Sequence, residues 1–442
     1  MLNAPTPTEP RSTSGTPVRR EGRLAALDGM RLLAALLVVL FHYVGTPQSH
    51  IWERENRAVF GRLFDFANYG YLGVQMFFVI SGFVICMSCW DRNLKDFFVS
   101  RVTRLYPMYW VAIVISFTVV YFNRGVALST GVIRAPTTLS DLLVNFTMAQ
   151  DALWVPSVDA VYWTLWAEAR FYLLFAIVVA FGLTYRRVLA FASLWLIAAV
   201  VTNHLDIALV DAVVQPIYAP YFILGILLYL IHRFGSTPLL WGLVGVTFLL
   251  AQHQVLLDTR HFNQFLGVHM KWTLSMVLFG GFVAVVAATA LGWLKWANWK
   301  WLTVAGVMTY PLYLMHQDIG VITIRRLKGQ IEPWALLPMM IVGMLILAYL
   351  GHRLVEKPFA PRLKKLLKAS MNFDTPSKIV PRGERTERVE RTAAAEAQPK
   401  PAAAEAHSEP TAAAMDAQTL PPPDHDRAEP VGVPDGARPG RG

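Results

Sequence analysis

LDGMRLLAALLVVLFH, residues 27–42, decides the fold class of this chain. With its neighbours it forms an apolar run over 24–44, long enough to cross a bilayer as one helix. Arg31 and His42 interrupt the run, and an ionisable side chain costs about 2.5–3.5 kcal/mol at the centre of a membrane. Such residues usually face a protein interior or a water-filled cavity. We therefore expect this helix to lie against other helices and to carry function.

Arg31 and His42 occupy one face of the predicted helix. Eleven residues at about 100° each amount to nearly three whole turns, so the two side chains are separated by roughly 16 Å along the axis. Asp28 precedes Arg31 by three residues and lies on a neighbouring part of the same face. A helix face that carries three ionisable residues is typical of a helix that lines a reaction path, rather than of a lipid-facing anchor.

The composition extends the membrane interpretation to most of the chain. Of 442 residues, 55% are hydrophobic and only 16% are charged, and long apolar runs recur. We predict an all-α fold, a polytopic transmembrane helical bundle of about ten spans. The net charge of +10 arises from basic residues beside the ends of the apolar runs, which indicates topology. Nucleic acid is not an expected partner.

The expected spans are 24–44, 70–90, 107–123, 163–184, 187–203, 212–233, 237–253, 272–294, 302–323 and 334–355. Lys and Arg at alternate ends place both termini on the inner side. Residues 1–22 are expected to be a disordered cytoplasmic leader and 23–368 the transmembrane domain. Residues 369–442, rich in Ala, Pro, Glu and Arg, are expected to be a disordered cytoplasmic tail.

Three titratable residues are predicted to reach one layer of the membrane from three helices: His42, Glu168 and His316. A carboxylate that orients an imidazole is a usual arrangement for a histidine general base, so we expect Glu168 to assist His42. Two alternatives stay open. Glu168 could pair with Arg170, and His316 could be a helix-end histidine bonded to a backbone carbonyl.

Arg101 and Arg104 lie in an expected inner loop, DFFVSRVTRLYP, residues 96–107. On a helix they would form a paired guanidinium surface, and each guanidinium offers a planar fork of donors suited to phosphate. The alternative is ordinary positive charge at the inner membrane surface.

Several motifs, taken in order, resemble the acyltransferase 3 family of bacterial integral-membrane O-acyltransferases. The resemblance covers roughly residues 24–360. It depends on the following segments: LDGMR (27–31) with His42, GVQMFFVISGF (73–83), RVTRLYP (101–107), WTLWAEARFY (163–172), YPLYLMH (310–316) and EKP (356–358).

The resemblance implies an enzyme that moves an acyl group, with acetyl favoured, from cytoplasmic acyl-CoA to a hydroxyl of a glycan, glycolipid or glycoside. It also implies a multi-pass protein of the bacterial inner membrane. Arg31 and His42 correspond to essential residues of the family, and Arg101 and Arg104 to residues linked to the CoA end. We expect no metal and no bound cofactor, with acyl-CoA as the donor substrate.

The expected site has two parts. Its catalytic residues are His42, Glu168 and Arg31, with His42 as general base or acyl carrier. Its substrate-binding residues are Asp28, Arg101, Arg104, Tyr310 and His316. The alternative from another functional class is a proton-coupled transporter or flippase in which Arg31, His42 and Glu168 form a proton relay.

Overall fold

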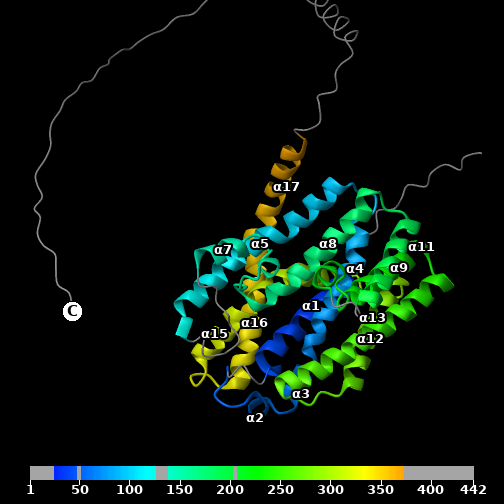
Figure 1. The fold of residues 1–442 in the computed structure, drawn as a ribbon. Helices are drawn as coiled ribbons and strands as arrows, with labels where there is room; N and C mark the ends of the chain where they lie inside the picture. The colour runs from blue at the N-terminus through cyan, green and yellow to red at the C-terminus, as the bar shows by residue number, and fades with distance from the viewer. Residues whose placement is uncertain (1–23, 47–50, 126–137, 203–206, 373–442) are drawn as a thin grey trace, which may run out of the picture. The chain divides into compact units, whose positions relative to one another are not determined.

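The computed structural model describes residues 24–46, 51–125, 138–202 and 207–372, and these residues form helices connected by turns (Figure 1). The expected leader lies outside the described residues, and so does the expected tail from residue 373 onward. The longer helices are α1 (Ala25–Leu40), α4 (Leu72–Cys89), α5 (Leu94–Phe122), α8 (Trp163–Ala180), α9 (Tyr185–Thr202), α11 (Ala219–Phe234), α12 (Pro238–Leu266), α13 (Trp272–Ala290), α14 (Lys300–Met315), α15 (Gln317–Leu327), α16 (Pro333–Gly351) and α17 (Lys357–Asn372).

The predicted all-α membrane fold is confirmed. Among the described residues, nine helical segments are long and apolar enough to cross a membrane. The ninth expected span, 302–323, is two shorter helices, α14 and α15, which meet at His316. The orientation with both termini inside stays a prediction.

Two expected span boundaries are wrong. The third span was expected from 107, but α5 begins at Leu94, because the side chain of Asn93 accepts a hydrogen bond from the Asp96 N–H at 2.8 Å and caps the helix. The seventh span was expected to end at 253, but α12 continues to Leu266. The expected end of the transmembrane domain at 368 stays a prediction; it falls within α17, which continues to Asn372.

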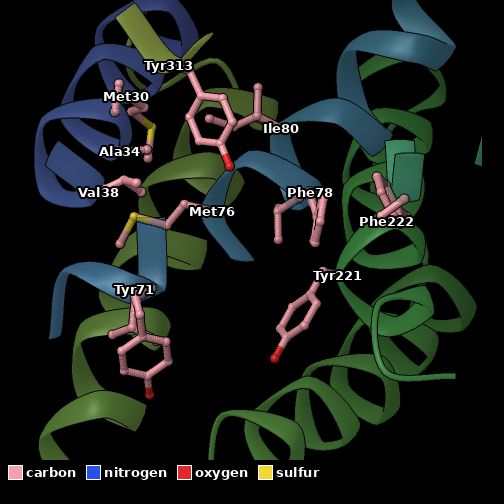
Figure 2. Packing of buried hydrophobic residues seen from close by; sticks show 14 of the residues in the cluster. Met30, Ala34, Val38, Tyr71, Met76, Phe78, Ile80, Tyr221, Phe222 and Tyr313 are labelled. Carbon is pink, nitrogen blue, oxygen red and sulfur yellow. The ribbon is translucent and has the colours of Figure 1, made fainter. Parts of the chain in front are cut away.

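Glycines bring α4 into backbone contact with its neighbours. A Cβ at Gly73 would lie 2.4 Å from the Ala34 carbonyl oxygen of α1, and a Cβ at Gly82 would lie 2.0 Å from the Phe222 carbonyl oxygen of α11. Both glycines belong to the GVQMFFVISGF segment. Small residues allow close helix approach where lipid provides no hydrophobic driving force. Figure 2 shows side chains at this helix contact, where Phe78 of α4 faces Phe222 of α11.

Both histidines of the expected site lie at irregular points of their helices. His42 is in a π-helical turn, Phe41–Gly45, that continues α1, and such turns are frequent at functional sites. His316 is the residue at which α14 ends and α15 begins. The hydroxyl of Tyr43 donates a hydrogen bond to the His316 carbonyl oxygen at 2.7 Å and ties the two irregular points together.

We predict that Gly82→Ala destabilises the protein by about 1–3 kcal/mol, because the added methyl group overlaps the α11 backbone and the helices must separate. The measurement is thermal unfolding of purified protein in detergent. Gly245→Ala on α12 is the matched control, because a Cβ there meets nothing within 4 Å. An unfolding midpoint for Gly82→Ala equal to that of the control would contradict the proposed packing.

Candidate active site

The centre of the site is a hydrogen bond between two histidine rings. Nδ1 of His42 lies 2.9 Å from Nε2 of His316, although 274 residues separate them in the sequence. On its other side, Nδ1 of His316 lies 2.8 Å from the carbonyl oxygen of Tyr313. His316 is fully buried, while His42 is partly exposed.

This chain of contacts fixes the tautomer of both rings when they are neutral. A carbonyl oxygen only accepts, so Nδ1 of His316 carries the proton and its Nε2 is an acceptor. The Nδ1–H of His42 therefore donates to Nε2 of His316. The remaining nitrogen of His42, Nε2, keeps its lone pair and is free to accept a proton from another group.

Arg31, Arg101 and Arg104 line a narrow cavity of about 90 Å³ together with Glu168, Tyr172 and Tyr310, which we call the basic cavity. The three guanidinium groups differ in depth. Arg104 is exposed and Arg101 is half-buried, while the Arg31 side chain is 16% exposed. Positive charge thus continues from the surface into the helix bundle.

Glu168 is the carboxylate of the basic cavity. Its Oε1 accepts a hydrogen bond from the Ser81 hydroxyl at 2.5 Å and another from the Tyr172 hydroxyl. The Arg101 guanidinium lies over the Tyr172 ring, 5.6 Å from its centroid. Glu168 therefore supports the aromatic surface on which Arg101 rests, and its charge offsets part of the positive charge of Arg31.

The expected pairing of Glu168 with His42 is wrong. Glu168 lines the basic cavity, whereas His42 is bonded to His316 and lines a different cavity. The alternative pairing with Arg170 is not what the structure shows either, since Arg170 donates to the Ala212 carbonyl oxygen and lies over the Trp166 ring. A shared depth in the membrane does not determine which cavity a side chain faces: on α8, Trp163 lines the cavity that contains His42, whereas Glu168 lines the basic cavity.

The expected role of His316 as a substrate contact also needs correction. With none of its surface exposed, the His316 side chain cannot touch a bound substrate in this conformation. The open alternative, a helix-end histidine bonded to a backbone carbonyl, is confirmed by the Tyr313 contact. The same ring also contacts His42.

Asp28 and Tyr310 hold the framework of the basic cavity. Asp28 lies 3.8 Å from the Arg31 guanidinium and packs so closely on Gly306 of α14 that a Cβ there would overlap its carboxyl group. Tyr310 lines the cavity, but its hydroxyl donates to the Leu105 carbonyl oxygen at 3.0 Å and so links α14 to α5.

A second, larger cavity of about 880 Å³ includes His42, Gln75, Trp163 and Asp258 in its lining, and we call it the histidine cavity. Val74 and Tyr313 line both cavities. The two spaces are therefore neighbours, separated by the side chains of these two residues. Figure 2 shows the Tyr313 hydroxyl pointing toward the middle of the bundle.

Several residues of the two cavities were not predicted. Tyr172 follows Glu168 by four residues on α8, so it could have been found by searching for polar residues on the Glu168 face. Ser81 lies on α4, in the GVQMFFVISGF segment, and nothing in the sequence relates it to Glu168. Asp258 was placed beyond the expected end of its span and was therefore not recognised as a carboxylate within a helix bundle. Val74 and Tyr313 carry no sequence signal for their position between the cavities.

Comparison with known proteins agrees with this architecture. A family model described as an acyltransferase domain matches residues 24–353. Acyltransferase MdmB of Streptomyces mycarofaciens is 27% identical over 158 residues, which is 35% of this chain and 38% of that protein. Peptidoglycan O-acetyltransferase OatA of Listeria monocytogenes is 31% identical over 97 residues, which is 20% of this chain and 12% of that protein.

The chain thus aligns with less than half of the length of either relative, and no solved structure matches it. The family match is much longer and includes Arg31, His42, Arg101, Arg104, Glu168 and His316. With several helices suited to crossing a bilayer, this is a multi-pass membrane protein, and it belongs to the acyltransferase 3 family.

Proposed function

We propose that this protein transfers an acyl group, in the simplest case acetyl, from acyl-CoA to a hydroxyl of a carbohydrate or glycoside. His42 is the general base and His316 holds it in the reactive tautomer. The acetyl group and the carbohydrate acceptor are supported by the name of one relative, a peptidoglycan O-acetyltransferase. The bacterial inner membrane is the proposed location.

The observation that carries this proposal is the His42–His316 hydrogen bond at 2.9 Å, anchored on the Tyr313 carbonyl oxygen. A general base needs a free lone pair, a fixed orientation and access to substrate. His42 has all three, because Nε2 is unprotonated, Nδ1 is held, and the ring lines a cavity large enough for an acceptor. His316 takes the place that a carboxylate occupies in many catalytic triads.

The donor fits the basic cavity. The guanidinium groups of Arg101 and Arg104, near the surface, can donate charge-assisted hydrogen bonds to the phosphates of acyl-CoA. Arg31 lies deeper in the basic cavity. The narrow volume suits an extended pantetheine arm better than a nucleotide. An arm that enters past Arg31 reaches Val74 and Tyr313, and beyond them the cavity that contains His42.

The chemical step needs only groups in this arrangement. Nε2 of His42 removes the proton of the acceptor hydroxyl as the oxygen forms a bond to the thioester carbonyl carbon. The carbon–sulfur bond then breaks, and the imidazolium proton goes to the departing CoA sulfur. Transfer through an acyl-histidine would use the same nitrogen, since Nδ1 is already engaged.

Release of free thiol from acetyl-CoA by purified protein tests the proposal. Wild-type protein in lipid nanodiscs is expected to release thiol in proportion to protein concentration. Acetyl-CoA left intact, with and without acceptor alcohols, would contradict acyl transfer and favour the alternative of a transporter or flippase.

We predict that His42→Ala abolishes acyl transfer and leaves membrane insertion unchanged, because removal of a polar group makes a span cheaper to insert. Product formation is measured by mass spectrometry on protein that elutes as a single species in detergent. His253→Ala, at an exposed histidine of α12, is the control and keeps full activity. Substantial product from well-inserted His42→Ala protein would overturn the assignment of the base.

We predict that His316→Leu lowers kcat by about 100-fold or more, since general-base catalysis contributes about 10²–10⁴-fold. The donor KM stays near that of wild type, because His316 lies away from the arginines. His316→Gln regains part of the loss, because its amide oxygen can accept the His42 Nδ1–H. Leu and Gln variants with the same kcat would show that His316 does not act through this hydrogen bond.

We predict that Arg101→Ala and Arg104→Ala each raise the donor KM roughly tenfold or more, since a hydrogen bond to a charged group contributes about 1.5–3 kcal/mol. Lys restores binding only in part, because an ammonium group does not reproduce the guanidinium fork. The measurement is a titration with acetyl-CoA. Arg186→Ala, at an exposed arginine, is the control. If the Arg101→Ala/Arg104→Ala double variant binds acetyl-CoA as tightly as wild type, the two arginines do not bind the donor and serve only as positive charge at the membrane surface.

A further inference from the structure

Asp258 is an ionisable residue of α12 in the wall of the histidine cavity, and the proposed reaction does not use it. Two amide groups hold its carboxylate. Gln75 of α4 donates to Oδ2 at 3.0 Å, and Gln254, one turn earlier on α12, donates to Oδ1 at 3.0 Å. Each carboxylate oxygen has further lone pairs that can accept hydrogen bonds from a ligand.

The helix that carries Asp258 is fixed beside the catalytic histidine. Phe262, one turn after Asp258, packs against Phe41 with ring centroids 5.8 Å apart and against Tyr71 at 4.8 Å. Phe41 is the residue immediately before His42. A ligand bound at Asp258 therefore lies in the same cavity as His42, on a wall that contacts the His42 helix.

The remaining wall of the cavity combines aromatic rings with aliphatic side chains. It includes Phe41, Tyr71, Trp163, Tyr218, Phe262 and Phe265. Aromatic rings combined with a few fixed polar groups are typical of sites for small amphipathic ligands. The apolar faces of a sugar ring pack on aromatic surfaces, while its hydroxyl groups donate to a carboxylate.

One polar atom beside Asp258 lacks a partner. Oε1 of Gln75 is buried and accepts no hydrogen bond within the described part of the chain. A buried acceptor left without a donor costs free energy, which a ligand hydroxyl could recover. Gln75 follows Val74, one of the two residues between the cavities, so such a hydroxyl would lie close to where the thioester arrives.

We propose that Asp258, held by Gln75 and Gln254, is the acceptor-binding group, and that the acceptor is a glycoside whose sugar hydroxyls donate to it while an apolar face packs on the aromatic wall. This inference rests on the proposed function and adds to it the residues that select the acceptor. Asp258 binds the acceptor and leaves the donor and the proton transfer to the other cavity residues.

The test compares Asp258→Asn with wild type in nanodiscs, with p-nitrophenyl β-glucoside as the glycoside probe and p-nitrobenzyl alcohol as a hydroxyl acceptor without a sugar. Asp258→Asn raises the KM for the glucoside about 10- to 100-fold. Its KM for the alcohol and its rate of thiol release without acceptor stay at wild-type values. Asp65→Asn, which removes an exposed carboxylate that pairs with Arg57, is the control and changes none of the three.

The outcomes separate this inference from the proposed function. Wild-type protein that releases no thiol would contradict the function itself. Thiol release together with an unchanged glucoside KM in Asp258→Asn, or wild-type preference for the alcohol over the glucoside, would overturn only the acceptor site. A parallel fall in thiol release, both acceptor reactions and thermal stability would make Asp258 a structural residue and would also overturn the inference.

Discussion

The hydrogen bond between His42 and His316 is the interaction on which the rest of the site depends. It joins the end of α1 to the junction of α14 and α15, and it is made where both helices are irregular. Tyr43 reinforces the same junction through the His316 carbonyl oxygen. Because His316 is also bonded to a backbone carbonyl, the direction of the hydrogen bond is set by the fold. In the proposed reaction, the nitrogen of His42 that acts as the base is thus defined before any substrate binds, which is the preorganisation that efficient catalysis requires.

Two neighbouring cavities, the basic cavity and the histidine cavity, lie close to this pair of histidines. The basic cavity concentrates guanidinium groups around one carboxylate, Glu168, and the histidine cavity places aromatic and amide groups around another, Asp258. In the proposed reaction, the separation of the arginines from His42 is favourable, since nearby positive charge would disfavour the imidazolium that forms when His42 accepts the proton. Val74 and Tyr313 lie where the spaces meet, so donor and acceptor can approach one another from separate sides.

Much of the fold could be predicted from the sequence, because membrane spans are specified by long apolar runs and by the cost of charge within them. Arg31 and His42 were predicted as functional for that reason, and the structure places both in cavities. The contact of Glu168 with Ser81 and that of His42 with His316 could not be predicted. Depth in the membrane was inferred from the position of each residue along its span, but the rotation of α8 about its axis depends on packing between helices. The break at His316 likewise has no strong local signal beyond Pro311.

The proposed general-base role of His42 requires that Nδ1 of its ring is protonated and that its Nε2 is not. Solid-state NMR of protein labelled with ¹⁵N-histidine in lipid bilayers tests it directly, with the His42→Ala variant used to assign the signals. We expect a protonated, pyrrole-type signal for Nδ1 of His42 and an unprotonated, pyridine-type signal for its Nε2 at neutral pH. In the His316→Leu variant we expect both tautomers of His42 to be populated. A His42 ring protonated at Nε2 in the wild-type protein would show that His42 cannot act as the proposed base.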